Sequence, residues 1–275
     1  MIFMVLLSTP AIAPGQLSPD ELASQGGHIH ALLYSSTTKE FLVGTHYGLF
    51  KSGDGKSWRR VADQLMGNTD VMGLRQNKAK PGVIFASGHD IGVYRSDDGG
   101  RSWAPSGKLP HNDVHALAWS PSHPDILYIF IVGYGLYKSQ DMGRSWQSVN
   151  PNMARAPILS LAVSPKDPDI IYTGLEGRFL ISRDGGRSWA ILGTVPASTI
   201  LSLLVESSNS FLAATDSGLF QSRDGGISWS RITHSLLRDH VVSIAYGPAG
   251  KIYGITYRGA ISESSDSGGS WKRVN

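Results

Sequence analysis

Histidine is the residue type whose placement in this 275-residue chain points most directly to chemistry. Histidines stand at both ends of short runs of Val, Ile, Leu and Ala in the first half of the chain. Imidazole nitrogens bind zinc, copper, iron and nickel, and a thioether beside them favours copper. The chain has no cysteine, so histidine and methionine are the softest donors that it can offer. The candidate ligands are His28, His30, His46, Met72, His89 and His115.

Two aspartates accompany these ligands. Asp70 precedes Met72 by two residues, and Asp113 precedes His115 by two, as His28 precedes His30. A carboxylate in such a place can orient an imidazole without binding the metal itself. The pattern therefore predicts a transition-metal site, with copper favoured by the thioether and zinc as the alternative. Without a metal, the same side chains would form a site for a small ligand.

A repeated box of Ser, Asp, Gly and Trp indicates which elements position these residues. Its cleanest copy is residues 182–189 (SRDGGRSW), and the tryptophans of six copies lie 40 to 45 residues apart. Such a period indicates an array of identical supersecondary units. In each box, the aspartate can accept backbone N–H bonds and the tryptophan can anchor the turn. The six pairs are Asp54 and Trp58, Asp98 and Trp103, Asp141 and Trp146, Asp184 and Trp189, Asp224 and Trp229, and Asp266 and Trp271.

Each repeat also contains four short runs rich in Val, Ile, Leu and Tyr, bounded by glycine and proline, which predict four strands. Six repeats predict an all-β, six-bladed β-propeller with four antiparallel strands per blade and the box between strands three and four. We expect the chain to begin with an innermost strand and to end with an outermost one, so that the ring closes by packing. The predicted blades are about residues 28–65, 66–108, 109–151, 152–194, 195–234 and 235–275, in a single propeller domain spanning 28–275.

The propeller frame places eight of the nine histidines on the face opposite the boxes, and only His123 on the box face. In an alignment of the innermost strands, His30 of blade 1 matches Met72 of blade 2 and His115 of blade 3. In blades 4 to 6 we match this position to Ser160, Ser202 and Ser243, and the position two residues earlier to Ile158, Ile200 and Val241. Innermost strands surround the central channel, so we expect the candidate ligands at one channel mouth.

The box resembles the Asp-box, or BNR repeat, of sialidases, sortilin-type receptors, xyloglucan-cleaving glycosidases and the photosystem II assembly factor. This resemblance covers all six repeats and implies the fold, which does not carry a function with it. Residues 28–32 (HIHAL), 45–49 (THYGL), 72–74 (MGL), 87–89 (SGH) and 115–117 (HAL) more closely resemble secreted bacterial Asp-box proteins of the glycosylhydrolase or sialidase-like kind. The His and Met positions of that family coincide with the candidate ligands, although Asp90 stands where its pattern has proline.

Two other functions fit the same face. A glycoside hydrolase needs two carboxylates beside the scissile bond, and Asp70, Asp113 and Glu176 are the candidates in loops that could converge. The Arg-Ile-Pro motif of sialidases is missing from the sequence. The other alternative is an assembly or scaffold propeller that binds a protein or peptide. We favour a non-catalytic protein, because the box carboxylates have the pattern of turn staples and no other catalytic motif is found.

Composition and the N-terminal residues bear on partners and location. The net charge is +3 and the basic residues are dispersed, so nucleic acid is not an expected partner. Residues 1–13 (MIFMVLLSTPAIA) resemble a signal peptide truncated at its basic start, which predicts a secreted or periplasmic protein. Residues 14–27 follow as a leader with no clear pattern. We expect a monomer, with no membrane span after the signal.

Overall fold

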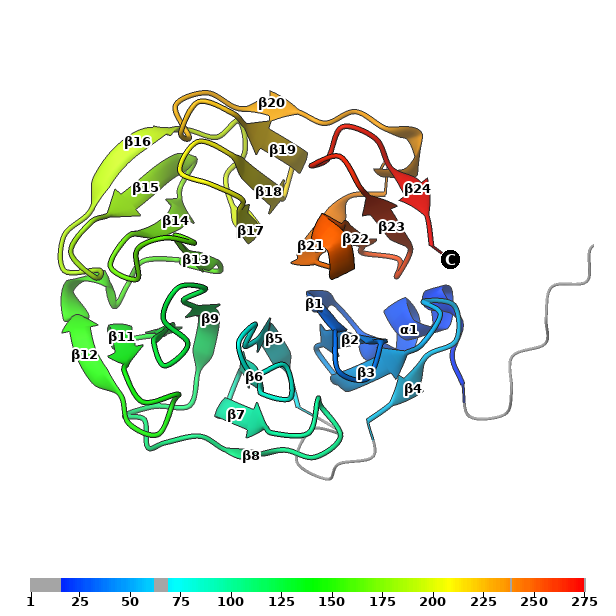
Figure 1. Ribbon diagram of the computed structural model, residues 1–275, viewed down its shortest axis with the longest axis horizontal. Coiled ribbons are helices and arrows are strands. Elements are labelled where there is room, and N and C mark those ends of the chain that lie inside the picture. Colours follow the sequence, from blue (N-terminus) through cyan, green and yellow to red (C-terminus); the bar gives the residue numbers. More distant parts are fainter. Residues whose placement is uncertain (1–15, 62–68, 238, 275) are drawn as a thin grey trace, which may run out of the picture.

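Six four-stranded antiparallel sheets surround a central axis in the computed structural model, which describes residues 16–61, 69–237 and 239–274. The sheets follow one another around the ring in sequence order, and the last sheet lies beside the first (Figure 1). The predicted all-β, six-bladed propeller is therefore confirmed. The predicted signal peptide, residues 1–13, lies outside the described residues.

Each blade takes its four strands from one continuous stretch of chain. The innermost strands are β1 (Ile29–Ser35), β5 (Val71–Gln76), β9 (Val114–Trp119), β13 (Leu161–Val163), β17 (Ile200–Val205) and β21 (Val241–Tyr246). The second strands are β2 (Glu40–Thr45), β6 (Ile84–Gly88), β10 (Leu127–Ile131), β14 (Ile171–Leu175), β18 (Phe211–Thr215) and β22 (Ile252–Thr256). The third strands are β3 (Gly48–Ser52), β7 (Gly92–Ser96), β11 (Gly135–Ser139), β15 (Arg178–Ser182), β19 (Gly218–Ser222) and β23 (Ile261–Ser264). The outermost strands are β4 (Arg59–Arg60), β8 (Ala104–Pro105), β12 (Gln147–Asn150), β16 (Ala190–Thr194), β20 (Ser230–Arg231) and β24 (Lys272–Arg273), and short 3-10 turns occur at η1 (Pro151–Met153), η2 (Ser235–Leu237) and η3 (Pro248–Gly250).

The hydrophobic core lies between neighbouring blades, where the facing sides of two sheets pack together. Between blades 1 and 6, Phe41, Phe50 and Trp58 pack with Tyr253 and Ile255, and the rings of Phe41 and Tyr253 have centroids 4.9 Å apart. Burial of one such side chain contributes about 1.5–3 kcal/mol to stability. The ring therefore closes by packing of blade 6 on blade 1, and no strand within residues 16–61, 69–237 and 239–274 is exchanged between these two blades.

The box turn between the third and fourth strands is held by its serine and its aspartate. In blade 4, Ser182 Oγ donates to Asp184 Oδ1 at 2.8 Å, and the same oxygen accepts the backbone N–H of Ser188 at 2.9 Å. The N–H of Gly186 donates to Ser182 Oγ at 2.7 Å, and Gly186 has a φ of 93°, which residues with a Cβ rarely adopt. The hydroxyl and N–H of Ser188, together with the Ser182 hydroxyl, lower the pKa of Asp184 to about 2. The Asp184 carboxylate thus accepts hydrogen bonds within its own turn and stabilises it.

One helix, α1 (Pro19–Gly26), occupies the segment predicted to have no clear pattern, and that prediction is wrong. Ser18 caps the helix: its Oγ accepts the N–H of Glu21, and the Glu21 carboxylate accepts the N–H of Ser18 at 2.7 Å. This capping box, with Pro19 at the first helical position, is a recognised helix start in sequence. The helix buries Leu22 between blades 1 and 6, so the leader packs on the propeller.

Near its start, the innermost strand carries a β-bulge in blades 1, 2, 3, 5 and 6. The register with the second strand skips one residue there, and that residue has no partner in the sheet. The skipped residues are His30, Met72, His115, Leu201 and Val242. In blade 4, Leu159 has the same place, two residues before Leu161 begins the strand. We call these six the bulge residues.

The bulge corrects the predicted alignment of blades 4 to 6 by one residue. The equivalents of His30 are Leu159, Leu201 and Val242, and not the serines Ser160, Ser202 and Ser243. The equivalents of His28 are Pro157, Thr199 and His240, and not Ile158, Ile200 and Val241. In blades 4 to 6 the skipped residue is apolar, as is the residue before it, so the sequence carries no mark of the bulge.

The three serines instead join neighbouring innermost strands. Each hydroxyl bonds to the backbone of the next blade: Ser160 Oγ donates to the Ile200 carbonyl (2.9 Å), Ser202 Oγ accepts the Ile244 N–H (3.2 Å) and Ser243 Oγ accepts the Leu32 N–H (3.0 Å). All three serines are buried. The same position in blades 1 to 3 holds Ala31, Gly73 and Ala116, which have no hydroxyl to offer.

Candidate metal centre at the channel mouth

Two imidazoles and one carboxylate meet where blade 1 packs against blade 2. His30 is the bulge residue of β1, His46 lies in the turn between β2 and β3, and Asp70 directly precedes β5. Asp70 Oδ1 lies 3.4 Å from His30 Nε2, and Asp70 Oδ2 lies 2.8 Å from His46 Nδ1. Gly44 permits this close approach, because a Cβ there would lie 2.5 Å from the carbonyl oxygen of Val71. We call His30, His46 and Asp70 the first His/Asp group.

A second His/Asp group, formed by His89, Asp113 and His115, lies where blade 2 packs against blade 3. His89 follows β6, Asp113 directly precedes β9, and His115 is the bulge residue of β9. Asp113 Oδ1 lies 2.7 Å from His89 Nδ1 and 3.1 Å from His115 Nε2. The two groups adjoin, since His89 Nε2 is 3.8 Å from Asp70 Oδ2. In each group, one ligand atom from every residue lies within 4.8 Å of the others.

Four buried atoms of these groups have no hydrogen-bond partner in the part of the chain that the structure describes. They are His30 Nε2, Asp70 Oδ1, His115 Nε2 and Asp113 Oδ1. They form two close nitrogen–oxygen pairs whose geometry is poor for a hydrogen bond, and Asp113 Oδ1 also lies 2.7 Å from His89 Nδ1. A buried polar atom without a partner costs about 1–3 kcal/mol. A cation bound between nitrogen and oxygen would remove this penalty in both groups.

The innermost histidines are in the protonation state that a metal requires. Burial lowers the pKa of His30, and repulsion from His28, His46 and His89 adds to the effect against the attraction of Asp70. Burial likewise lowers the pKa of His115, against the opposing attraction of Asp113. Both imidazoles are therefore neutral at pH 7, and the neutral ring is the form that binds a metal ion.

The spacing of the donor atoms is close to that around a small tetrahedral ion. Bonds of about 2.0–2.1 Å place neighbouring ligand atoms roughly 3.3 Å apart. The His30–Asp70 and His115–Asp113 pairs, at 3.4 and 3.1 Å, are near that separation, whereas Asp70 and Asp113 lie closer to His46 and His89. The side chains of His46 and His89 are 50% and 39% exposed, so they have room to shift. Three ligands per group would leave one position for water or a further ligand.

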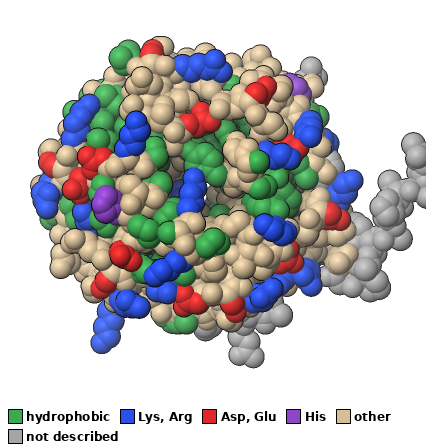
Figure 2. Space-filling model, in the orientation of Figure 1, with side chains coloured by type: hydrophobic (Ala, Val, Ile, Leu, Met, Phe, Trp, Pro, Cys, Tyr) green, Lys and Arg blue, Asp and Glu red, His purple; other side chains and the backbone are tan. Residues whose placement is uncertain are grey.

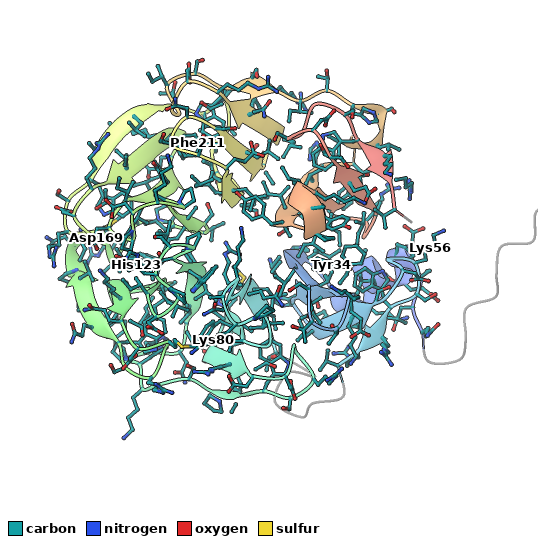
Figure 3. The ribbon with its side chains drawn as sticks, viewed as in Figure 1. Tyr34, Lys56, Lys80, His123, Asp169 and Phe211 are labelled. Atoms are coloured by element: carbon teal, nitrogen blue, oxygen red, sulfur yellow. The ribbon has the colours of Figure 1, made fainter. Side chains whose placement is uncertain are left out.

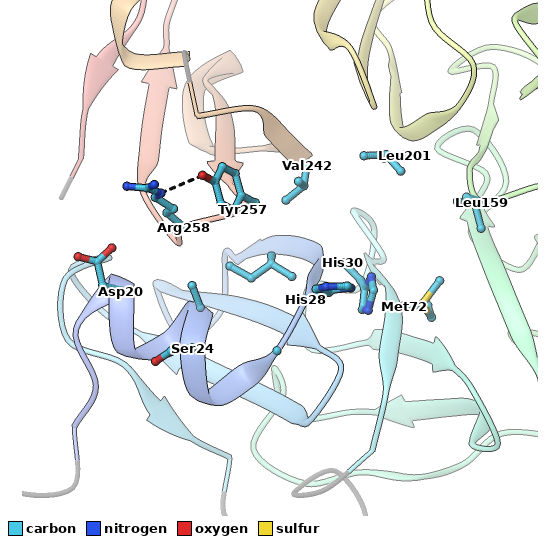
Figure 4. Close-up of a pocket in the computed structure, with 13 residues that line it drawn as sticks. Asp20, Ser24, His28, His30, Met72, Leu159, Leu201, Val242, Tyr257 and Arg258 are labelled. Atoms are coloured by element: carbon cyan, nitrogen blue, oxygen red, sulfur yellow. Dashed lines mark hydrogen bonds between the residues drawn. The ribbon is translucent and has the colours of Figure 1, made fainter.

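A pocket of about 740 Å³ opens beside the first group at the channel mouth (Figure 4). Its inner wall is formed by His28 and by the bulge residues His30, Met72, Leu159, Leu201 and Val242. The ring centroids of His28 and His30 are 6.4 Å apart. The predicted ligands His28 and Met72 thus belong to neither His/Asp group, and they face the pocket that adjoins the first one.

The outer wall of the pocket contains residues that sequence reasoning did not single out. Asp20 and Ser24 come from α1, and Tyr257 and Arg258 come from the turn after β22. Arg258 Nε donates to Tyr257 Oη at 2.9 Å (Figure 4). Tyr257 follows the second strand of blade 6 as His46 follows that of blade 1, so the repeat frame contained the signal for this side of the pocket.

The three carboxylates predicted for a glycoside hydrolase have different surroundings. Asp70 lies near Nε2 of His89, and Asp113 lies near Nδ1 of the same ring. Glu176 lies in the turn between β14 and β15 with a φ of 50°, and lines a separate pocket with Pro157 and Ser198. The structure therefore brings the two aspartates to one cluster, and places the glutamate in another pocket.

Comparisons with known proteins support the propeller fold. The Sortilin-Vps10 family model (sortilin, neurotensin receptor 3) matches residues 91–202, less than half of the chain. No curated protein matches the sequence. No helix among the described residues is long and apolar enough to cross a membrane.

Solved structures of other propellers superpose on this chain. The GH74 xyloglucanase from Xanthomonas campestris has 18% identity and a TM-score of 0.64, covering 90% of this chain and 45% of the enzyme. An ancestral GH74 enzyme has 21% identity and a TM-score of 0.55, covering 74% of this chain and 31% of the enzyme. YCF48 bound to D1 peptide has 16% identity and a TM-score of 0.50, covering 74% of this chain and 65% of YCF48. This chain spans less than half the length of the GH74 enzymes, and identities this low establish a shared fold only.

Proposed function

We propose that the protein is a non-catalytic propeller that binds divalent transition-metal ions through the two His/Asp groups at one channel mouth. The observation that carries the proposal is the repeated pair of a buried imidazole nitrogen and a buried carboxylate oxygen without hydrogen-bond partners. Such a pair occurs at two successive blade junctions, and each is completed by a second histidine from a turn. Two imidazoles and a carboxylate form a donor set for copper(II), zinc, nickel or iron.

Copper is the preferred metal and zinc the alternative. Copper(II) binds a given set of nitrogen and oxygen ligands more tightly than the other divalent ions of the first row. Met72 lies beside His30 in the adjoining pocket and offers a thioether, which is a ligand for copper(I). The His/Asp groups need no contribution from Met72 to bind copper(II) or zinc. Binding of copper(I) would need the Met72 thioether.

Metal analysis of protein purified without a histidine tag tests the proposal. We expect bound copper or zinc after dialysis against each ion, with copper displacing zinc in competition. His30→Ala should remove the ion of the first group and His115→Ala that of the second. His123→Ala is the matched control, because His123 lies on the box face and contacts Ser122 there.

Several outcomes would contradict this function. Wild-type protein that retains no copper or zinc would exclude it, as would a His30→Ala, His115→Ala double variant that binds as the wild type does. Met72→Leu separates the two oxidation states of copper: we expect weaker copper(I) binding and unchanged copper(II) and zinc binding. Circular dichroism of each variant shows whether a loss of metal comes from a loss of fold.

A second candidate is a propeller that binds a peptide on the same face. Tyr47, Tyr134 and Tyr257 follow second strands in blades 1, 3 and 6, and their exposed fractions are 54%, 40% and 47%. Exposed tyrosines are frequent anchors at protein interfaces. YCF48, which shares the fold, has been solved with a D1 peptide. A Tyr47→Ser, Tyr257→Ser variant that still binds metal but no longer binds a peptide selected on the wild type would support this candidate.

We also propose an extracytoplasmic location, supported by the signal-like pattern of residues 1–13. A fusion of residues 1–27 to alkaline phosphatase, which is active only after export, tests it. Activity of the fusion in intact bacteria is the expected result. Replacement of Leu6 and Leu7 by aspartate should abolish that activity, because a charged run cannot serve as the apolar region of a signal. Equal activity with and without the apolar run would contradict the proposed location.

A further inference from the structure

Arg75 breaks an otherwise apolar ring inside the central channel. It stands on β5, three residues after the bulge residue Met72. The equivalent positions of the other five blades are Leu33, Ala118, Ala162, Leu204 and Ala245. All six residues line one pocket of about 130 Å³, further along the channel than the bulge residues. One guanidinium is therefore surrounded by leucine and alanine side chains.

Arg75 has no carboxylate to neutralise it in the described part of the chain. Arg75 Nη1 donates to the carbonyl oxygen of the preceding residue, Leu74, at 2.8 Å. The lining of this pocket includes neither Asp nor Glu among its described residues. Burial alone lowers the pKa of Arg75 to about 10, so the group is charged at neutral pH. A half-buried charge without a counter-ion is unfavourable, and a bound anion would remove this cost.

A second cation stands at the box-face end of the same pocket but is already engaged. Lys78 Nζ lies 4.5 Å from the ring centroid of Tyr246, in a cation–π contact. Basic side chains reach the centre of the ring in the face shown in Figure 2. The channel thus offers an anion one guanidinium that has no carboxylate partner among the described residues, while Lys78 near the opening is held by Tyr246.

We propose that this part of the channel binds a small organic anion, a carboxylate with a short aliphatic chain. The planar guanidinium of Arg75 can bind a carboxylate through two parallel hydrogen bonds. The leucine and alanine walls would cover the aliphatic chain, which they could not do for an inorganic anion. A volume of about 130 Å³ corresponds to roughly four water molecules, which limits the ligand to a few carbon atoms.

This anion site is separate from the proposed metal groups. Three residues of a strand span about 10 Å, so Arg75 lies that far along the channel from the bulge position. Its ring of equivalents contains no histidine or acidic residue. Loss of metal binding would therefore leave anion binding unchanged, and loss of anion binding would leave metal binding unchanged.

Titration calorimetry of the whole protein with butyrate, acetate, 1-butanol and inorganic phosphate tests the site, in a buffer without other carboxylates. We expect saturable binding of one butyrate, weaker binding of acetate, and no binding of 1-butanol or phosphate. Arg75→Leu introduces the residue that blades 1 and 5 have at this position. We expect this variant to bind butyrate at least tenfold more weakly, to bind metal normally, and to melt at a higher temperature than ligand-free wild type. Arg155→Leu, at an exposed arginine, is the control and should bind butyrate as the wild type does.

Three results would overturn the proposal: no saturable butyrate binding by the wild type, equal binding by Arg75→Leu, or phosphate binding as tight as that of butyrate. The last result would mean that charge alone holds the anion and that the apolar walls contribute nothing. Should Arg75→Leu fail to fold, Arg75→Gln serves instead, because it keeps a polar side chain but no charge. Unchanged butyrate affinity in a folded Arg75→Gln protein would equally overturn the proposal.

Discussion

Blades 1 to 3 and blades 4 to 6 are built from the same repeat but differ at two successive positions of the innermost strand. The first is the bulge position, which holds His30, Met72 and His115 in one half of the ring and Leu159, Leu201 and Val242 in the other. The next position holds Ala31, Gly73 and Ala116 in the first half and Ser160, Ser202 and Ser243 in the second. The first half presents donor atoms to the channel mouth, and the second presents apolar side chains there.

We infer from this difference that the proposed binding site and the hydrogen bonds between innermost strands belong to different halves of one ring. In blades 4 to 6, buried serines tie each innermost strand to the next blade. In blades 1 to 3, the strands meet at the mouth through His/Asp pairs whose buried atoms lack hydrogen bonds. Such pairs are unfavourable in the absence of a ligand. We therefore expect mutations in the first half to change metal binding and mutations in the second half to change stability alone.

The largest expected effect is loss of metal binding when the first half loses its carboxylates. In Asp70→Asn, Asp113→Asn, the neutral amides are poor ligands and no longer attract a cation, so we expect affinity for copper and zinc to fall about 100-fold. Competition with a coloured chelator measures this change. His240→Asn alters the equivalent position of blade 6 and should leave affinity unchanged. Equal losses in the two variants would show that the halves do not differ in the way we propose.

A smaller effect is expected from replacing glycines that allow neighbouring blades to approach. Both replacements should lower stability, but only the one in the first half should weaken metal binding. A Cβ on Gly44 would lie 2.5 Å from the Val71 carbonyl oxygen, and one on Gly174 would lie 2.5 Å from Ile200 Cγ1. We expect Gly44→Ala and Gly174→Ala each to lower the free energy of unfolding by about 1–3 kcal/mol. Urea denaturation checks the stability. Only Gly44→Ala should also weaken metal binding, since it displaces β2 from Asp70; weakening by both would contradict a local site.

A still smaller effect is expected when a serine of the second half is removed. Ser243→Ala leaves the Leu32 N–H without its buried acceptor, and we expect a loss of about 1 kcal/mol in the free energy of unfolding. Metal affinity should not change. Ser243→Thr, which keeps the hydroxyl, is the control. Denaturation curves that are identical for Ser243→Ala and wild type would show that the serine bonds add nothing to stability.

The box spacing made the fold predictable, because one turn chemistry recurs six times with glycines and a tryptophan at fixed places. It also made the face of the histidines predictable, since the strands of every blade run back and forth between the same two faces of the ring. His30, His46, His89 and His115 were therefore expected at one mouth, and the structure places them there with Asp70 and Asp113. The grouping follows from repeat geometry, and the chemistry follows from residue type.

The finer arrangement depends on features that the sequence does not mark. The bulge residues Leu201 and Val242 are apolar like the residues before them, so nothing in the sequence marks them and the alignment of blades 4 to 6 was displaced by one residue, onto the serines. His28 and Met72 line the pocket and belong to neither His/Asp group, a division that depends on side-chain positions and not on residue type. Helix α1 differs in this respect, because its capping box of Ser18 and Glu21 is a mark of a helix start that the sequence does carry.

The smallest expected effect concerns the box face, where the two halves should not differ at all. Hydroxyl and N–H donors of Ser188, Ser228 and Ser270 lower the pKa values of Asp184, Asp224 and Asp266 from 3.8 to about 2. In blade 2, burial acts to raise the pKa of Asp98, but hydrogen bonds from Ser102 and Ser96 outweigh it and bring the value to about 2 as well.

A carboxyl whose pKa is lower in the folded protein contributes stability that is present above its unfolded pKa, near 3.8, and is lost as the pH falls toward 2. We therefore expect the melting temperature to decrease between about pH 4 and pH 2, below the range in which histidines titrate. Asp184→Asn and Asp98→Asn should each make this decrease slightly shallower, and by similar amounts, because each removes one such carboxylate. A shallower slope in only one of the two variants would mean that the difference between the halves extends from the channel mouth to the box turns.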